Sequence, residues 1–350
     1  MRTLFWYEFK KLITNKALWA FLVLCVLFNI GTVLMNSNIE IDSSTPFPVN
    51  VFHDFDTLEI AEVYITELEL SGRAARLMRA KYYALQPVVY DKALAGVSYD
   101  AYLGIQSHFM HQRLFSTFPI EGLMGRLYFM GILLSVFLGL LSTTYEKANN
   151  TEDCIYATKT GRYLLRYKIA ASLAACLGLY VLLVLVSLFS HILVFDYANA
   201  WDSSISSGFN YLLDQFIGMR PFITWRSFTV ASYLLAHVGS SIGLIICFLF
   251  FGIIVGICSK NEYIGFLIVI LINAAFVALP SLFSINSVVR YVVMHSPIWI
   301  WWHSGLWFTD GGYITLWRHF ELWGIGISLI LLIALCILLV KMYEKKFFTK

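Results

Sequence analysis

Six long apolar runs alternate with shorter polar stretches along this chain of 350 residues. A helix needs about 20 largely apolar residues to cross the hydrocarbon core of a bilayer. Runs of this kind predict spans at 17–35, 123–145, 169–195, 229–258, 263–285 and 322–341. The pattern therefore predicts an all-α membrane protein with six transmembrane helices.

The first 16 residues carry a different pattern, in which apolar and charged positions alternate at helical spacing. Leu4, Phe5 and Phe9 can share one face, while Glu8 and the neighbouring lysines point elsewhere. An amphipathic helix on the membrane surface is expected from such a segment, which also carries interfacial aromatic residues. An ordinary basic flank that only fixes orientation is the alternative.

Residues 36–122, between the first two spans, are too numerous for a simple connector and predict a helical outer domain. Its helices are expected at 55–70, 72–94 and 99–115. A basic stripe on the middle helix comes from Arg73, Arg76 and Arg79. This stripe is either a solvated face paired with Glu67 and Glu69, or a site for an anionic lipid or peptide.

Two further loops lie on the same side as this domain. Residues 196–228 are rich in serine and predict a partly flexible loop. Residues 286–321 are apolar and aromatic but are broken by two histidines and a proline, which favours re-entrant helices over a seventh span. This segment contains Trp299, Trp301 and Trp302, interpreted either as interfacial anchors or as contacts for an amphipathic substrate.

Basic residues orient the predicted bundle. With both termini inside, the inner segments hold 14 of the 25 Lys and Arg residues but only six of the 22 Asp and Glu residues. An excess of Lys and Arg marks the cytoplasmic side. Both termini, the tail at 342–350 and the polar hairpin at 146–168 are therefore predicted to be cytoplasmic, in a plasma membrane expected to be bacterial.

The composition and the motifs support a membrane protein and predict no catalytic or metal site. The chain is 59% hydrophobic and 13% charged, whereas soluble domains are about 25% charged. It has no phosphate loop, no HExxH and no GxSxG motif, and its six cysteines lack metal-ligand spacing. We therefore expect no catalytic residue, no metal site, no cofactor and no nucleic-acid partner. An enzyme using His191 or His237 is disfavoured, because neither has a paired acid.

Polar side chains inside the spans are costly unless they are paired or face a cavity. His237, Ser240 and Asn273 are the candidates for a translocation path. Glycines spaced as GxxxG accompany them at 239 and 243 and at 252 and 256. Close helix packing is the alternative explanation for this group of residues.

The polar hairpin between the second and third spans is the main candidate for function. Asn150 or Thr151 can cap a short helix, and Glu152 and Asp153 suit the positive end of its dipole. Gly161 is expected to end it. A short helix parallel to the membrane, with an exposed polar side, would be a docking surface, whereas a solvated loop that only sets topology is the alternative.

The chain resembles the permease subunit of a type 2 ABC exporter in three segments. These are YEFKK before the first span, TYEK at the end of the second, and YATKTGR with YLLRYK in the hairpin. In that family the hairpin is the coupling helix, which sits in a groove of a separate ATP-binding subunit. The resemblance also implies re-entrant helices before the last span. The implied coupling residues are Glu146, Thr151, Glu152, Tyr156, Thr158, Thr160, Gly161 and Arg162.

The function expected from this resemblance is export of an amphipathic substrate such as a peptide, an antibiotic or a lipid-like molecule. A second permease subunit, identical or different, and the lipid bilayer are the other expected partners. ATP and magnesium are expected in the partner ATPase subunit and not in this chain. The alternative is a non-transporting membrane sensor or assembly protein whose extracellular domain binds a ligand.

Overall fold

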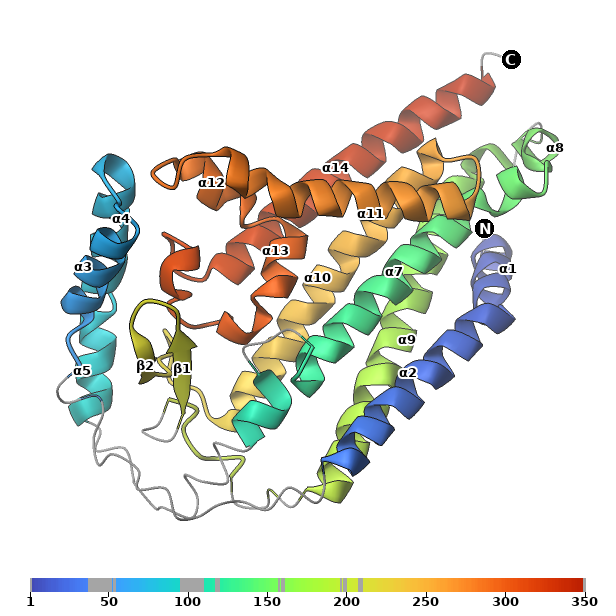
Figure 1. Cartoon of the computed structure of the whole chain (residues 1–350). Helices are drawn as coiled ribbons and strands as arrows, with labels where there is room; N and C mark the ends of the chain where they lie inside the picture. Colours follow the sequence, from blue (N-terminus) through green and yellow to red (C-terminus); the bar gives the residue numbers. More distant parts are fainter. Residues whose placement is uncertain are drawn as a thin grey trace.

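The fold was obtained as a computed structural model, shown in Figure 1. It describes residues 2–36, 52, 55–94, 110–116, 120–156, 158, 161–195, 197, 200–206 and 210–348. Six helices of this part of the chain are long and apolar enough to cross a membrane. They are α2 (Lys16–Met35), α7 (Leu123–Ala148), α9 (Leu164–Val194), α10 (Val230–Cys258), α11 (Glu262–Ala278) and α14 (Phe320–Phe348).

Helix α7 lies at the centre of this bundle and packs against α9, α10 and α11. Its apolar stretch is 83% buried inside the protein, whereas those of α11 and α14 are 17% and 22% buried. The backbones of α7 and α10 meet at glycines: a Cβ on Gly252 would lie 2.9 Å from the Val136 carbonyl oxygen, and one on Gly256 would lie 2.0 Å from Thr143 Oγ1. This GxxxG pair therefore serves close packing, while Gly239 faces open space.

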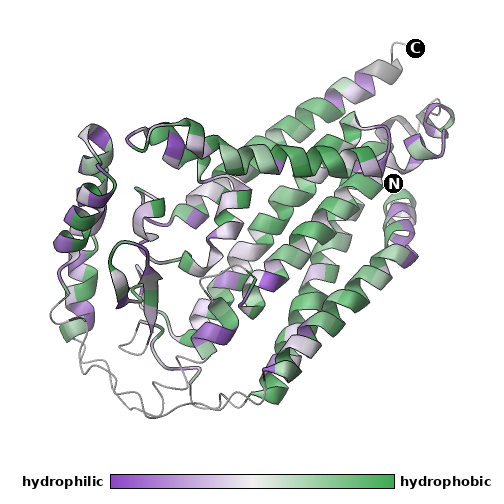
Figure 2. Ribbon diagram, in the orientation of Figure 1, coloured by the Kyte–Doolittle hydropathy of each residue, from purple (hydrophilic) through white to green (hydrophobic). Residues whose placement is uncertain are grey.

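Apolar and hydrophilic residues occupy different parts of the molecule. Figure 2 shows apolar residues along the six long helices and hydrophilic residues gathered toward the ends. One end carries α1 (Arg2–Ile13), α8 (Glu152–Tyr156) and the C-terminal end of α14, and is called the hairpin end. The other carries the segments between α2 and α7 and is called the loop end. The chain therefore has the architecture of a multi-pass membrane protein.

The loop end contains helices, as expected, but also a small sheet. Its helices are α3 (Thr57–Glu67), α4 (Gly72–Tyr83), α5 (Gln86–Leu94), α12 (Val288–Val293) and α13 (Pro297–Trp302). Strands β1 (Tyr211–Asp214) and β2 (Gly218–Pro221) pair antiparallel within the loop expected to be partly flexible. The all-α prediction is wrong at this point, because Asp214 accepts the Phe216 amide at 2.9 Å and Gly218 has a φ of 82°, which together close a hairpin turn.

The other predicted spans correspond to observed helices, but α14 continues to Phe348, through the tail expected at 342–350, and further details differ. The helix expected at 72–94 is divided into α4 and α5. Of the helix expected at 99–115, residues 110–115 are helical and the rest lies outside the described residues. The basic stripe does not pair with Glu67 or Glu69: Arg79 binds Glu62 on α3 through two hydrogen bonds of 2.6 and 2.9 Å.

Candidate functional site

The polar hairpin folds as a single helical turn held against the next span. Helix α8 has only five residues, and the 3-10 turn η1 (Gly161–Tyr163) leads into α9. The Gly161 amide donates to Thr158 Oγ1 at 2.9 Å, and that hydroxyl donates to the Ile155 carbonyl at 2.8 Å. A Cβ on Gly161 would lie 1.8 Å from the same carbonyl oxygen. Only glycine therefore fits where the chain turns back.

Glu146, at the end of α7, is the centre of a buried ion cluster. Its carboxylate accepts a 2.7 Å hydrogen bond from Lys11 of α1 and a second one from Lys168 of α9. Glu8 lies 3.5 Å from the Lys11 ammonium, and both it and Glu146 are almost fully buried. The inward position of Glu8 and Lys11 differs from the expected polar face of α1. The cluster joins α1, α7 and α9 where the hairpin begins.

Other contacts fasten the hairpin to the remaining spans. Lys147 donates to the carbonyl oxygens of Gly256 at 3.1 Å and Ser259 at 3.2 Å, so it satisfies the end of α10. On the other side, Tyr343 of α14 donates to Glu152 of α8. Arg166 binds Glu344 through two hydrogen bonds of 2.8 and 2.7 Å. Helix α8 is therefore hydrogen-bonded to α14, while the adjoining ends of α7 and α9 are bonded to α10 and α14, respectively.

The predicted coupling residues differ in exposure. Thr151 and Thr158 are exposed, Glu152 is half-buried and Gly161 is buried. Asp153 and Cys154, which were not among the predicted coupling residues, are also exposed. Glu146 is 4% exposed, so its carboxylate binds lysines of the same chain instead of a partner surface. Thr160 and the side chains of Tyr156 and Arg162 lie outside the described residues.

Of the three residues predicted to line a translocation path, only Asn273 borders either of two cavities found between the helices of the described part of the chain. His237 is buried in an aromatic cluster, where Nδ1 lies 2.7 Å from the Tyr128 hydroxyl and the ring stacks on Trp307. Asn273 lines a cavity between α10, α11 and α14, and donates to the Val269 carbonyl at 2.8 Å. Ser240 is half-buried on α10 and lines neither this cavity nor the one beside it.

The tryptophans of α13 also differ from one another. Trp301 is buried and stacks on Phe129 of α7 with ring centroids 5.5 Å apart. Trp299 donates from Nε1 to the Phe276 carbonyl of α11 at 2.9 Å. Trp302 is 50% exposed. Two of the three therefore hold α13 against the bundle, which leaves Trp302 as the side chain best placed to meet a lipid or a substrate.

A polar contact inside the bundle was missed by the sequence reasoning. Asn29 of α2 is fully buried and donates to Ser187 of α9 at 3.1 Å. Arg126, near the start of α7, lies 3.4 Å from the Asn29 amide oxygen. A single asparagine within the apolar run 17–35 was the available signal, since such a residue in a span usually finds a partner on a neighbouring helix.

At the loop end, a second buried ion cluster joins three separate loops. Arg220 of β2 donates to Asp310 at 2.9 Å and lies 3.4 Å from Asp214. Lys81 of α4 donates to the carbonyl oxygens of Asp310 and Thr315 at 3.1 and 2.8 Å. The phenols of Tyr64 and Tyr82 donate to Asp214 and Asp310, respectively. We call the six residues that contribute side chains (Tyr64, Lys81, Tyr82, Asp214, Arg220 and Asp310) the loop-end cluster.

Burial and charge act against each other in the loop-end cluster. Desolvation lowers the pKa of Lys81 to about 7, although Asp310 partly offsets this effect. The pKa of Asp310 is lowered, because Arg220 and Lys81 outweigh the desolvation that would raise it. Desolvation raises the pKa of Tyr82 well above its usual value. The cluster therefore contains a carboxylate held ionised and an amine that titrates near neutral pH.

Comparisons with family models, curated proteins and solved structures found no match to this chain. The function must therefore be argued from the two ends of the bundle and from the cavities between its helices.

Proposed function

We propose that this chain is the membrane-spanning permease subunit of an ABC exporter, and that α8 transmits movement from a separate ATP-binding subunit. The observation that carries the proposal is a short polar helix at the hairpin end, which is hydrogen-bonded to α14 through Glu152 and lies in the chain between α7 and α9, whose own ends are joined to each other and to α10. A force on α8 would reach α14 through Glu152 and α9 through the Gly161 turn. The exposed Asp153 and Thr158 are the surface offered to the ATPase.

The charge distribution supports a cytoplasmic hairpin end. Lys and Arg residues gather there, as the positive-inside rule requires of a cytoplasmic face. The loop end would then be extracellular. An ATP-binding subunit must reach cytoplasmic ATP, so it can dock only at the hairpin end.

The energy source would lie outside this chain, whose sequence has no phosphate loop. An amphipathic cargo suits the bundle, since α13 and α14 present Trp302 and Trp323 as exposed aromatic residues. A second permease subunit would complete the transporter, because the low burial of α2, α11 and α14 leaves broad apolar faces for either lipid or a second bundle.

The proposal is tested by purifying the tagged full-length chain from its native membranes and identifying bound proteins by mass spectrometry. A protein with a phosphate loop and an LSGGQ-like motif is expected. Asp153→Lys should reduce its recovery about tenfold, which corresponds to about 1.4 kcal/mol of lost contact. Glu67→Lys, an equally exposed charge reversal at the loop end, is the matched control and should leave recovery unchanged.

Failure to recover any ATP-binding protein with the wild-type chain would overturn the proposal. It would favour a sensor or assembly protein that binds a ligand at the loop end. Equal loss of the ATPase with Asp153→Lys and Glu67→Lys would show that α8 is not the docking element.

A further inference from the structure

Two adjoining cavities lie between α11, α13 and α14, on the side of the bundle where these helices are least buried. One has a volume of about 480 Å³ and the other of about 260 Å³. They share Phe276, Ser296, Ser328 and Leu331 in their walls and so lie side by side; together they are called the groove. The larger cavity alone falls in the range of about 300–1,000 Å³ found for small-molecule sites.

The groove opens sideways toward the region that lipid would occupy. Val292, Trp323, Ile327 and Leu331 line it and are each more than half exposed. Val292 belongs to α12 and the other three to α14; α14 and the neighbouring α11 are mostly uncovered by the rest of the protein. A ligand can therefore enter from the bilayer without crossing the core of the bundle.

The length of the groove matches one leaflet. Its lining residues on α14 run from Trp323 to Leu332, nine residues apart, which is roughly 14 Å at about 1.5 Å per residue. The hydrocarbon core of a bilayer is about 30 Å thick, so this distance is close to half of it. Trp323, an exposed aromatic residue near the start of the helix, marks the level of the headgroups.

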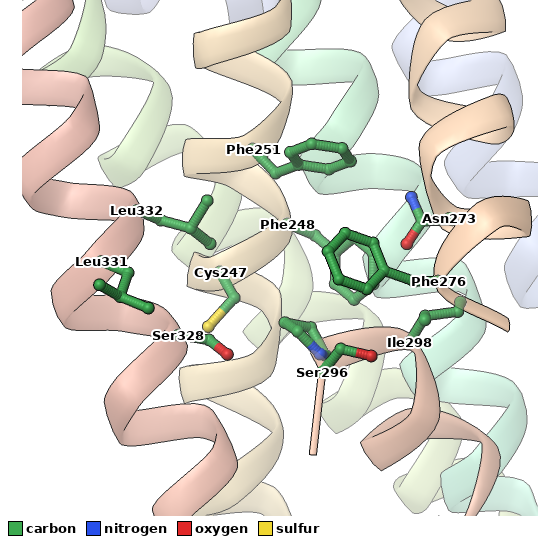
Figure 3. Close-up of a pocket in the computed structure, with 11 residues that line it drawn as sticks. Cys247, Phe248, Phe251, Asn273, Phe276, Ser296, Ile298, Ser328, Leu331 and Leu332 are labelled. Atoms are coloured by element: carbon green, nitrogen blue, oxygen red, sulfur yellow. The ribbon is translucent and has the colours of Figure 1, made fainter. Parts of the chain in front are cut away.

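Both cavities are mainly apolar, and each also has polar side chains in its wall. The cavity next to Trp323 is lined by His295 and Trp317, whereas the deeper one is lined by Phe248, Phe251 and Asn273. Ser296 is in the wall of both cavities, and Figure 3 shows it with the other residues that line the smaller one. Among the described residues, its hydroxyl oxygen is one of the buried polar atoms that have no hydrogen-bond partner. A buried hydroxyl in that state costs free energy until an acceptor reaches it.

We propose that this groove binds one glycerophospholipid of the leaflet on the loop-end side. Its headgroup and glycerol lie in the cavity beside Trp323, and the Ser296 hydroxyl donates to an ester carbonyl. One acyl chain fills the deeper cavity between Phe276 and Leu332. Lipid at this position wedges α11 and α14 apart and supports α13, whether or not the protein is a transporter.

The test uses the full-length protein in nanodiscs of phosphatidylcholine that contain a trace of phosphatidylcholine with a photoreactive diazirine in one chain. After irradiation, labelled peptides are mapped by mass spectrometry. The peptides that contain Phe276, Ile298 or Leu331 should be labelled more heavily than the α9 peptides that contain the lipid-exposed Leu185 or Leu193. Equal labelling of groove and α9 would reduce the groove to ordinary bilayer contact and overturn the proposal.

Two variants make the result specific. Ser328→Phe places a larger side chain where the two cavities adjoin. The overpacking should weaken lipid binding by about 1.4 kcal/mol and so lower labelling of the groove about tenfold. Ile330→Phe, on the exposed side of the same helix, is the matched control and should change nothing. Unchanged labelling in Ser328→Phe would contradict the proposal, as would cross-links from the groove to a second copy of the chain.

Ser296→Ala provides an independent measurement, because it removes only the hydroxyl. Loss of one hydrogen bond, worth about 1 kcal/mol, should weaken lipid retention about fivefold after detergent extraction. The phospholipid that remains with the purified protein is quantified by mass spectrometry. The same amount of lipid in the variant and the wild type would show that Ser296 does not contact the ligand.

Discussion

Two lysines from different helices converge on the carboxylate of Glu146. Their positions in the sequence are 135 and 22 residues away, so spacing along the chain gave no sign of the cluster. The sequence shows an acidic residue at the end of a span, and the resemblance to the exporter family predicts a role for it at a partner surface. The structure gives it a different immediate task, which is to neutralise Lys11 and Lys168 in a buried site.

Glu146→Gln is expected to destabilise the protein, because it leaves the buried Lys168 ammonium without its anion and leaves Lys11 with only Glu8, 3.5 Å away. Removing one partner of a buried ion cluster costs about 3–5 kcal/mol. Thermal unfolding of the detergent-solubilised full-length protein should show a clearly lower midpoint. Asp153→Asn, an exposed acid of the same hairpin, serves as control and should leave the midpoint unchanged. Equal midpoints for wild type and Glu146→Gln would contradict the role given to the cluster.

At the scale of single elements, the apolar runs predicted the spans well. The limits of α10 agree within one residue, because Thr229 provides a capping box at its start. Helix α11 is shorter than predicted, since Pro280 follows its last turn and a 3-10 turn takes over. The β-hairpin was missed because its strands have four residues each, and a paired strand that short carries little periodic signal.

The hairpin turn offers a test at this scale. Gly161→Ala should displace α8, because the new Cβ would collide with the Ile155 carbonyl. Faster amide hydrogen exchange is expected across residues 152–163. Gly178→Ala in α9 is the matched control, since nothing lies within 4 Å of its Cβ position and alanine favours a helix. Unaltered exchange in Gly161→Ala would mean that the turn tolerates a side chain and that α8 is not held by it.

For the molecule as a whole, the loop-end cluster decides how the loops are arranged. Lys81 lies in the first loop, Arg220 in the second and Asp310 in the third. No pattern within one loop could reveal that these charges meet. The sequence did indicate that the first loop is helical, but it could not place α4 against the segment that follows α13.

The titration of Lys81 leads to a dependence of stability on pH. The unfolded chain keeps this amine protonated up to a pKa near 10.5, whereas in the folded protein burial lowers the pKa to about 7. Between these values the unfolded state binds more protons, so the free energy of unfolding rises with pH. The gain from about pH 7 to about pH 9 is on the order of 2 kcal/mol.

Thermal unfolding of wild type and Lys81→Met at these two pH values isolates the contribution of this amine. The midpoint of the variant should rise less with pH than that of the wild type. Lys10→Met, which removes an exposed lysine at the hairpin end, is the control and should keep the wild-type slope. Parallel pH profiles for wild type and Lys81→Met would show that the pKa of Lys81 is the same in the folded and the unfolded protein.

The same cluster sets an order of events during synthesis. Lys81 is made 229 residues before Asp310, whose carbonyl it must reach. Four of the six long helices, α7, α9, α10 and α11, emerge in between. The first loop therefore lacks these contacts, and the Lys81 amine remains hydrated, until nearly the whole polypeptide has left the ribosome. A chain stopped before residue 310 would expose that unfinished surface to quality control.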